Sequence, residues 1–227
     1  MIKPIPDLSK AGISKSQGLL IERGPKVMKP SDRNALEFAL QIHEKSSASP
    51  ANKNKSEVVA LALSGPEGEG LLKEAMALGA ERAVILSDPS FLEDEATSIA
   101  ISLAHACLNL DADLILAGEG QVGHRVAEEM KIPSATAVLG IASDPNSLKV
   151  SMRIAPQPID LERSSLILIS ILPGSNTPRI ANALKIMKAS KKEILKWTPA
   201  EIGLTPEATG AASAGMQTVR TFSFENP

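Results

Sequence analysis

Three glycines near the middle of the chain have the spacing of a phosphate-binding turn. Gly118, Gly120 and Gly123 follow a short apolar run and lead into a segment that predicts a helix from about His124. In an open parallel sheet, ligands gather where strands end, because helix N-termini there present unpaired N–H groups to anions. The residues of this turn that would contact a nucleotide are Gly118, Gly120, Gln121, Val122 and Gly123.

A second strand end offers a similar turn at Ser64, Gly65 and Pro66. Ser64 therefore joins the nucleotide-binding candidates. Glycine turns of this kind are more often plain connections between a strand and a helix than phosphate sites. Glu119 also places a carboxylate where a pyrophosphate needs hydrogen-bond donors. The residues alone leave open whether either turn binds a nucleotide.

Residue types that perform catalysis form no recognisable group in this sequence. Ser64 and Ser170 lack the context of a nucleophile elbow, and Cys107 lies on a predicted helix face as a small buried hydrophobe. The three histidines are scattered, so their spacing predicts no metal site, and one cysteine excludes an internal disulfide. We predict no catalytic residues, which favours a carrier or binding subunit over an enzyme.

The overall composition is that of a globular protein. Hydrophobic residues make up 43% and charged residues 22%, and the formal net charge of −2 provides no electrostatic footprint for nucleic acid or an anionic membrane. No stretch approaches the roughly 18 consecutive apolar residues of a membrane helix, and the start of the chain lacks the pattern of a signal peptide. We therefore expect a cytoplasmic protein without membrane insertion or nucleic-acid partner.

Strands and helices alternate regularly through the middle of the sequence, and they must position the two turns. The segment 71–78 predicts a helix that Gly79 closes, and Asp88 and Pro89 predict the start of a longer one. Continuous apolar runs predict buried strands at 58–63, 83–86 and 114–117. Buried strands separated by helices indicate an α/β fold with a doubly wound, mostly parallel sheet.

The flanking segments extend this core. Ser31 and Asp32 predict the N-cap of a helix that reaches about Lys45, and 180–192 predicts a weaker helical or looped segment. The Ala-, Gly- and Ser-rich tail predicts a C-terminal arm. Further strands are expected at 136–141, 148–154 and 166–172, and turn residues between the first two predict antiparallel additions to the sheet. We expect one domain over 1–204 and the arm over 205–227.

Several segments, in their order along the chain, resemble the β subunits of electron transfer flavoproteins, including FixA-like members. The resemblance covers about Ser31 to Leu204, and the order of its motifs is more specific than any single one. The matching stretches are 34–40, 65–66 with 72–83, 113–118, 120–123 with 127–133, and 176–179 running into 186–192.

This resemblance implies a Rossmann-like fold of the adenine nucleotide hydrolase type and an electron carrier subunit that is not an enzyme. Such a subunit pairs with an α subunit, and the pair holds one FAD and passes electrons from flavin-dependent dehydrogenases to an acceptor. The β subunit's own domain binds AMP, or a second FAD in bifurcating members. The segment 179–189 would be the loop offered to dehydrogenases, with candidate contacts at Arg179, Ala183, Leu184, Met187 and Lys188.

Departures from the family pattern put the nucleotide in doubt. The segment 2–7 matches the end of the family's first strand, with most of that strand missing. The turn at Gly118 is about seven residues shorter than in the family, and Glu119 replaces a threonine that contacts phosphate. Lys29, Pro30 and Ser31 stand where the family has Asn-Pro-Phe near the flavin. These changes predict a weakened or lost AMP site.

Two other functions stay open. The chain could be a non-redox interaction protein of the same fold that forms a homodimer through its apolar strands. An ATP-using adenylating enzyme would need a Ser-Gly-Gly-x-Asp-Ser loop after a strand, and the residues from Ser64 to Glu67 do not supply one.

Overall fold

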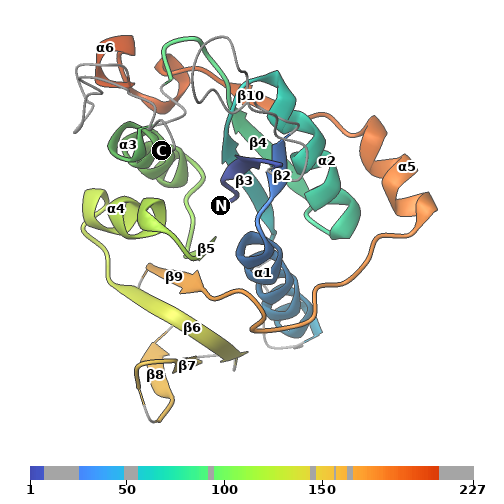
Figure 1. Ribbon diagram of the computed structural model, residues 1–227, viewed down its shortest axis with the longest axis vertical. Coiled ribbons are helices and arrows are strands. Elements are labelled where there is room, and N and C mark those ends of the chain that lie inside the picture. The colour runs from blue at the N-terminus through green and yellow to red at the C-terminus, as the bar shows by residue number, and fades with distance from the viewer. Residues whose placement is uncertain are drawn as a thin grey trace, which may run out of the picture.

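The strands of the computed structural model form two main sheets and one small pair (Figure 1). The strand orders are β10-β4-β3 in the first sheet, β5-β9-β6-β7-β8 in the second, and β1-β2 in the pair. The small pair joins β1 (Pro4–Pro6) to β2 (Lys26–Met28) in antiparallel fashion. The structure describes residues 1–7, 26–48, 56–91, 95–143, 147–155, 157–162 and 166–209.

The first sheet is built on a βαβ unit. Strands β3 (Val59–Leu63) and β4 (Arg82–Leu86) run parallel, with the short 3-10 helix η2 (Pro66–Gly68) and helix α2 (Glu69–Leu78) between them. Gly79 ends α2 with a φ of +141°, a conformation that favours glycine. The predicted strands and helix of this unit are therefore confirmed. The short strand β10 (Leu195–Trp197), which the sequence did not predict, pairs with the outer side of β4.

The second sheet mixes parallel and antiparallel strands. Its parallel members are β5 (Leu114–Gly118), β9 (Ile167–Ile171) and the first part of β6 (Ser134–Ser143). Strands β7 (Ser147–Met152) and β8 (Ile159–Glu162) follow as antiparallel additions. The predicted antiparallel members are confirmed, although the turn residues 144–146 lie outside the described residues.

Helices cover both sheets, and one of them starts later than predicted. The expectation that Asp88 opens a long helix is wrong, because the Asp88 carboxylate accepts hydrogen bonds from Ser90 in a separate turn. Helix α3 begins at Ala96, where the Glu95 side chain accepts a hydrogen bond from the Ser98 amide at 2.6 Å. The larger helices are α1 (Pro30–Ala48), α3 (Ala96–Asn109), α4 (Gln121–Glu129) and α5 (Ala183–Lys191).

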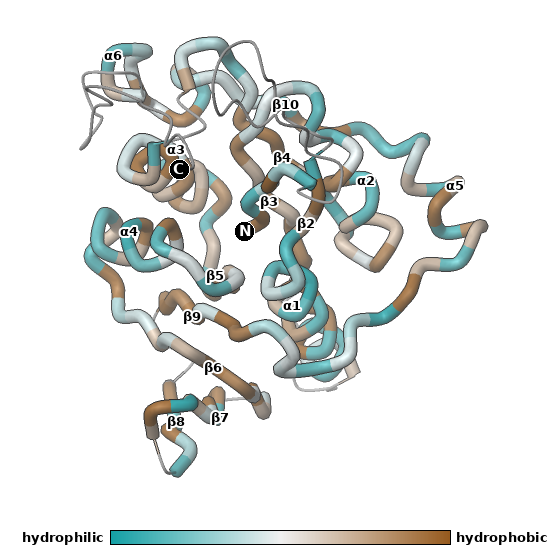
Figure 2. Tube along the Cα trace, viewed as in Figure 1, coloured by the Kyte–Doolittle hydropathy of each residue, from teal (hydrophilic) through white to brown (hydrophobic). Residues whose placement is uncertain are grey.

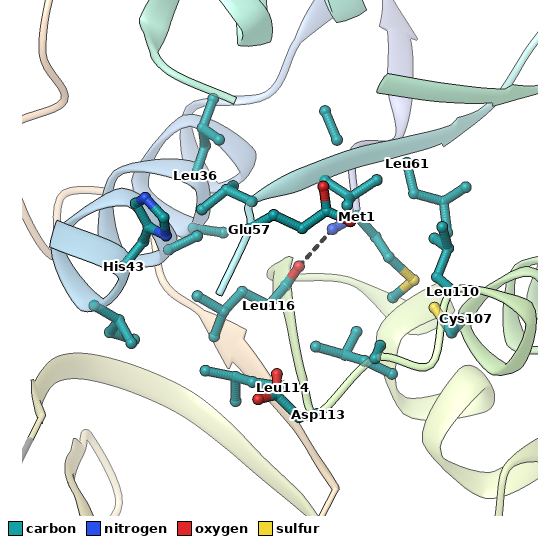
Figure 3. A pocket seen from close by; sticks show the side chains of 18 of the residues that line it. Met1, Leu36, His43, Glu57, Leu61, Cys107, Leu110, Asp113, Leu114 and Leu116 are labelled. Carbon is teal, nitrogen blue, oxygen red and sulfur yellow. Dashed lines mark hydrogen bonds between the residues drawn. The ribbon is translucent and has the colours of Figure 1, made fainter. Parts of the chain in front are cut away.

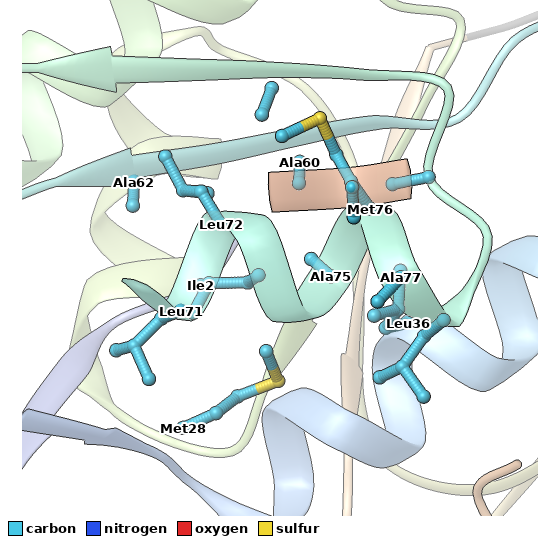
Figure 4. Packing of buried hydrophobic residues seen from close by; sticks show 14 of the residues in the cluster. Ile2, Met28, Leu36, Ala60, Ala62, Leu71, Leu72, Ala75, Met76 and Ala77 are labelled. Carbon is cyan, nitrogen blue, oxygen red and sulfur yellow. The ribbon is translucent and has the colours of Figure 1, made fainter. Parts of the chain in front are cut away.

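The core lies on both faces of the strands. Helix α2 packs Leu72, Ala75 and Met76 against Ala60 and neighbouring residues of the first sheet (Figure 4). Figure 2 shows β3 and β4 as the apolar centre of the fold, whereas the outer face of α4 is hydrophilic. Each fully buried aliphatic side chain stabilises the fold by about 1.5–3 kcal/mol before entropic costs. None of the helices among the described residues could span a membrane.

The two main sheets are separated by a gap between β3 and β5. Met1 and Ile2 reach into this gap, and Figure 1 shows the N-terminus between the two strands. The Ile2 amide donates to the Leu61 carbonyl at 2.8 Å, and the Met1 amino group donates to the Leu116 carbonyl at 2.6 Å. A cavity of about 390 Å³ lies in the gap (Figure 3). The α/β fold is as predicted, but its parallel strands do not form one continuous sheet.

The last described residues pack onto α3. Helix α6 (Pro206–Thr209) follows the 3-10 helix η3 (Ala200–Ile202), and the Ser98 hydroxyl donates to the Thr209 carbonyl at 2.5 Å. Most of the predicted C-terminal arm, from residue 210 onward, lies outside the described residues.

Candidate functional site

The two predicted nucleotide turns lie where β3 and β5 end, and one segment contacts both. The Lys26 ammonium donates to the Ser64 hydroxyl at 3.0 Å, and the Lys29 ammonium donates to the Glu119 carbonyl at 2.9 Å. Because Lys26 and Lys29 are only three residues apart, the structure brings Ser64 and the Gly118 turn to the same edge. We call this edge, made of Ser64 and residues 118–123, the strand-end site.

A buried carboxylate occupies part of the strand-end site. Asp32, in the first turn of α1, accepts hydrogen bonds from the Gly118 amide at 3.1 Å and the Lys3 amide at 3.0 Å. A side chain at Gly118 would overlap the Asp32 carboxylate and the Ser31 hydroxyl. The glycine is thus explained by the protein's own carboxylate, which takes the N–H group that a phosphate would use.

Burial raises the pKa of Asp32, although Lys29, at 3.8 Å, and the two backbone donors act in the opposite direction. The sequence predicted Asp32 only as an N-cap residue. Its contact with Gly118 joins positions 86 residues apart and has no local sequence pattern.

The remaining residues of the Gly118 turn divide into exposed and buried positions. Gly120, with a φ of +151°, precedes α4, and Gln121 is exposed in its first turn. Val122 and Gly123 are buried, and Gly123 lies against Ala117 and Leu168. Of these four residues, Gly120 and Gln121 are the ones that face solvent at the helix start. The nucleotide contacts assigned to this turn stay a prediction.

Glu119 adds negative charge beside the turn. Its exposed carboxylate lies 3.9 Å from the Arg153 guanidinium, while its carbonyl accepts from Lys29. An exposed ion pair at this distance contributes little to stability. The carboxylate would therefore repel an approaching phosphate, and the weakening of the AMP site stays a prediction.

At the start of the predicted partner-recognition segment, Arg179 binds Glu37 and Glu44 of α1, and we call these contacts the Arg179 clamp. Arg179 donates to the buried Glu37 carboxylate at 2.8 Å and to Glu44 at 2.6 Å. Burial alone would raise the pKa of Glu37, but hydrogen bonds from Arg179 and Gln41 hold it below its ordinary value. The Arg179 hydrogen bond also lowers the pKa of Glu44. Arg179 thus fixes its segment to α1.

Paired asparagines strengthen this attachment. Asn34 donates to the Asn176 carbonyl at 2.8 Å and accepts from the Gly174 amide at 3.0 Å, while Asn176 donates back to the Asn34 carbonyl at 2.9 Å. The sequence marks these residues only as parts of family motifs. Their contact spans 142 residues of sequence, so local patterns cannot reveal it.

The clamp presents α5 at the rim of the molecule beside α2 (Figure 1). The expected loop 179–189 is helical from Ala183, because the Asn182 side chain accepts from the Lys185 amide at 2.9 Å and caps the helix. Ala189 is the buried contact of α5 with the core. The other predicted contacts on α5 are all exposed: Ala183, Leu184, Met187 and Lys188.

Large apolar side chains on α5 and just before it are exposed. Ile180 is 94% exposed and Leu184 64% exposed, and Ile186 and Met187 are each more than half exposed. We call Ile180, Leu184, Ile186 and Met187 the α5 surface. Exposed clusters of large apolar residues are typical of protein contacts.

Catalytic and metal chemistry has no further support in the described part of the chain. No group of three or more metal-binding side chains occurs among the described residues. Burial raises the pKa of the Cys107 thiol to about 11, so the nucleophilic thiolate is suppressed.

Comparison with known proteins identifies the family. Residues 17–202 match the family model described as electron transfer flavoprotein domain. The chain belongs to the electron transfer flavoprotein family.

Individual relatives place the chain near the family's β subunits. It is 30% identical to the caffeyl-CoA reductase-Etf complex subunit CarD of Acetobacterium woodii, over 97% of this chain and 85% of that protein. It is 29% identical to the electron transfer flavoprotein subunit beta of Clostridium acetobutylicum, over 88% of this chain and 78% of the relative. Protein FixA of Sinorhizobium fredii is 28% identical, over 89% and 74%. The predicted β-like, FixA-like resemblance is confirmed.

Proposed function

We propose that this chain is the β-like subunit of an electron transfer flavoprotein. It pairs with an α-like subunit, and the pair holds one FAD and carries electrons from flavin-dependent dehydrogenases to an acceptor. The match of the family model to residues 17–202 supports the carrier role, and the exposed α5 surface is the structural observation that carries the partner assignment. The chain itself performs no bond-breaking step.

The role of this chain's residues is to dock and to position. The Arg179 clamp and the Asn34–Asn176 pair hold the start of the recognition segment against α1. The α5 surface then offers small apolar anchors to a dehydrogenase, which suits a weak and transient contact. FAD, when the pair binds it, supplies the redox chemistry.

The AMP site of the family is degenerate in this chain. A phosphate at the Gly118 turn would compete with Asp32 for the Gly118 amide and would meet the Glu119 carboxylate. Both interactions disfavour an anion. The residues present therefore do not fit AMP, and no step of the proposed function uses it.

Co-expression with an α-like subunit of an electron transfer flavoprotein tests the proposal. The purified complex should show the absorbance bands of bound flavin, and heat should release AMP in less than stoichiometric amount, as weighed by mass spectrometry. A stable complex without flavin would contradict the electron-carrier role. Stoichiometric AMP would contradict the degenerate site while leaving that role intact.

A further inference from the structure

Helix α5 presents the α5 surface, yet little of the helix is packed into the core. Of its nine residues, Ala189 is the one that is buried, and it joins the cluster that α2 forms with the first sheet. A helix this short is not stable by itself in water. Contacts at its two ends must therefore decide how α5 lies on the molecule.

The N-terminal end of α5 is fixed by contacts described above. The Asn182 side chain caps the helix through the Lys185 amide, and the Arg179 clamp holds the preceding segment against α1. These contacts fix the point at which α5 begins. A rod that is held at one end can still pivot, so the direction of α5 depends on a second attachment near its C-terminal end.

Two lysine ammonium groups make this second attachment. Lys73, on α2, donates to the Ser190 carbonyl at 3.2 Å and to the Lys192 carbonyl. In the opposite direction, the Lys192 ammonium donates to the Glu81 carbonyl at 3.2 Å. The last carbonyls of a helix have no partner inside it, and lysine side chains can bind them. We call these three hydrogen bonds the lysine ties.

The lysine ties determine which side of α5 faces a partner. Successive residues of a helix are turned by about 100°, so Leu184 and Met187 lie on roughly the opposite side from Ala189. With Ala189 held against the core, Leu184 is 64% exposed and Met187 is 54% exposed. A tilt or rotation of α5 would move both apolar side chains away from this position.

We propose that Lys73 and Lys192 are positioning residues for docking, because they fix the end of α5 and present the α5 surface in one preformed orientation. The inference rests on the proposed function, since it concerns the same contact with a dehydrogenase. A partner then meets apolar anchors that are already in place. Binding does not have to order the helix, and this lowers its entropic cost.

Electron transfer from a purified flavin-dependent dehydrogenase to the flavin-loaded complex of this chain with its α-like subunit tests the positioning. Lys73→Met should raise the KM for the complex about ten-fold at an unchanged maximal rate, because docking precedes the electron transfer step. Lys192→Met should raise it about three-fold, since it removes one tie rather than two. Lys73→Arg should stay within about two-fold of the original chain, because a guanidinium also donates to carbonyls.

Lys191→Met is the matched control. Lys191 is exposed on α5, and its ammonium group makes no hydrogen bond or ion pair with another described residue. The substitution removes the same charge close to the lysine ties and should change KM by less than about two-fold. If it raises KM as much as Lys73→Met does, or if Lys73→Met leaves KM unchanged, the proposal is overturned.

A double-mutant cycle tests whether Lys73 acts through the α5 surface. Leu184→Asp should weaken the apparent affinity about ten-fold in the original chain. In the Lys73→Met chain the same substitution should weaken it less than about three-fold, because the anchor is already displaced. If the two effects simply multiply, Lys73 acts independently of Leu184 and the positioning role fails.

Amide hydrogen exchange tests the lysine ties in the isolated chain, without electron transfer. The amides of α5 should exchange at least about ten-fold faster in Lys73→Met, whereas those of β3 and β4 should keep their protection. Unchanged exchange in α5, or lost protection in β3 and β4 as well, would overturn the inference and leave the proposed function standing. A complex that accepts no electrons from dehydrogenases, although α5 responds as expected, would contradict the proposed function and the docking role together.

Discussion

Several buried charged groups in this protein hold distant parts of the chain together. Asp32 joins the N-terminal segment to the end of β5, and Glu37 joins α1 to the recognition segment through Arg179. A buried charge is tolerated only where hydrogen bonds compensate its lost solvation. These residues therefore act in positioning, and changes to them should alter stability before they alter function.

Replacing Arg179 with methionine tests the clamp. Arg179→Met should lower the free energy of unfolding by about 2 kcal/mol, because buried Glu37 loses a charged hydrogen-bond partner. Urea unfolding measures this change. Arg33→Met is the matched control, since Arg33 pairs with Glu74 at 2.6 Å on a more exposed surface, and it should cost less than about 1 kcal/mol. Equal losses in the two variants would refute the clamp.

Acid should remove the same contribution. The pKa values of Glu37 and Glu44 are lowered in the folded state from an ordinary value of 4.5. Their contribution is therefore complete above that value and is lost as the pH falls through the lowered pKa values. The original chain should lose more stability between pH 6 and pH 3 than Arg179→Met does, as followed by circular dichroism. If stability falls equally with pH in both chains, the Arg179 clamp does not cause the pKa shifts of Glu37 and Glu44.

Acetylation of Met1 tests the buried amino group. Its pKa is lowered from 8.0, so the folded chain binds fewer protons than the unfolded chain between the lowered value and 8.0. Stability should rise with pH across that window, and acetylation should flatten the rise and increase stability at pH 7. Melting temperatures should be measured only up to about pH 8.5, because the raised pKa of Cys107 makes stability fall above pH 9. An acetylated chain with an unchanged profile would contradict the burial of this charge.

At the scale of elements, the sequence predicts what local pattern controls. β3, α2 and β4 are predictable because each strand is a continuous apolar run and Gly79 marks the end of the helix. β8 and β10 are only four and three residues long, too short for their alternation of apolar and polar residues to be distinctive, so their pairing depends on tertiary neighbours. The position of the strand-end site follows from the glycines. The side chains that occupy the site do not follow from a local pattern, because Asp32, Lys26 and Lys29 come from distant parts of the sequence.

Helix α5 provides the prediction at this scale. Leu184→Asp should lower the apparent affinity for the partner dehydrogenase, measured by electron transfer, about ten-fold, because it places a charge in an apolar contact. The substitution lies on an exposed helix face and should leave the melting temperature unchanged. Leu108→Asp, at an exposed position of α3, is the matched control and should leave coupling intact. If both variants couple normally, α5 is not the docking surface.

At the scale of the whole molecule, the gap between β3 and β5 divides the strands into two groups, each with its own helices. The two groups are joined mainly by α1, by the packing of α3 and α4, and by the two residues at the N-terminus. Strands β7 and β8 extend away from this joint, and Ile154, just beyond β7, is 74% exposed. The chain thus combines an incompletely filled interior with exposed apolar residues at two ends, which suits a subunit that gains stability from a partner.

Light scattering distinguishes a dependent subunit from a self-sufficient dimer. The isolated chain should have a mass near 23.9 kDa and should form a one-to-one complex when the α-like subunit is added. The complex should melt higher than either chain, since a partner that binds only the folded state stabilises it by mass action. Leu108→Asp should pair normally, whereas Ile154→Asp should weaken pairing if the β7–β8 end contacts the α-like subunit. A tight homodimer that ignores the α-like subunit would instead favour a non-redox interaction protein, because the apolar surfaces would then be satisfied by a second copy of the same chain.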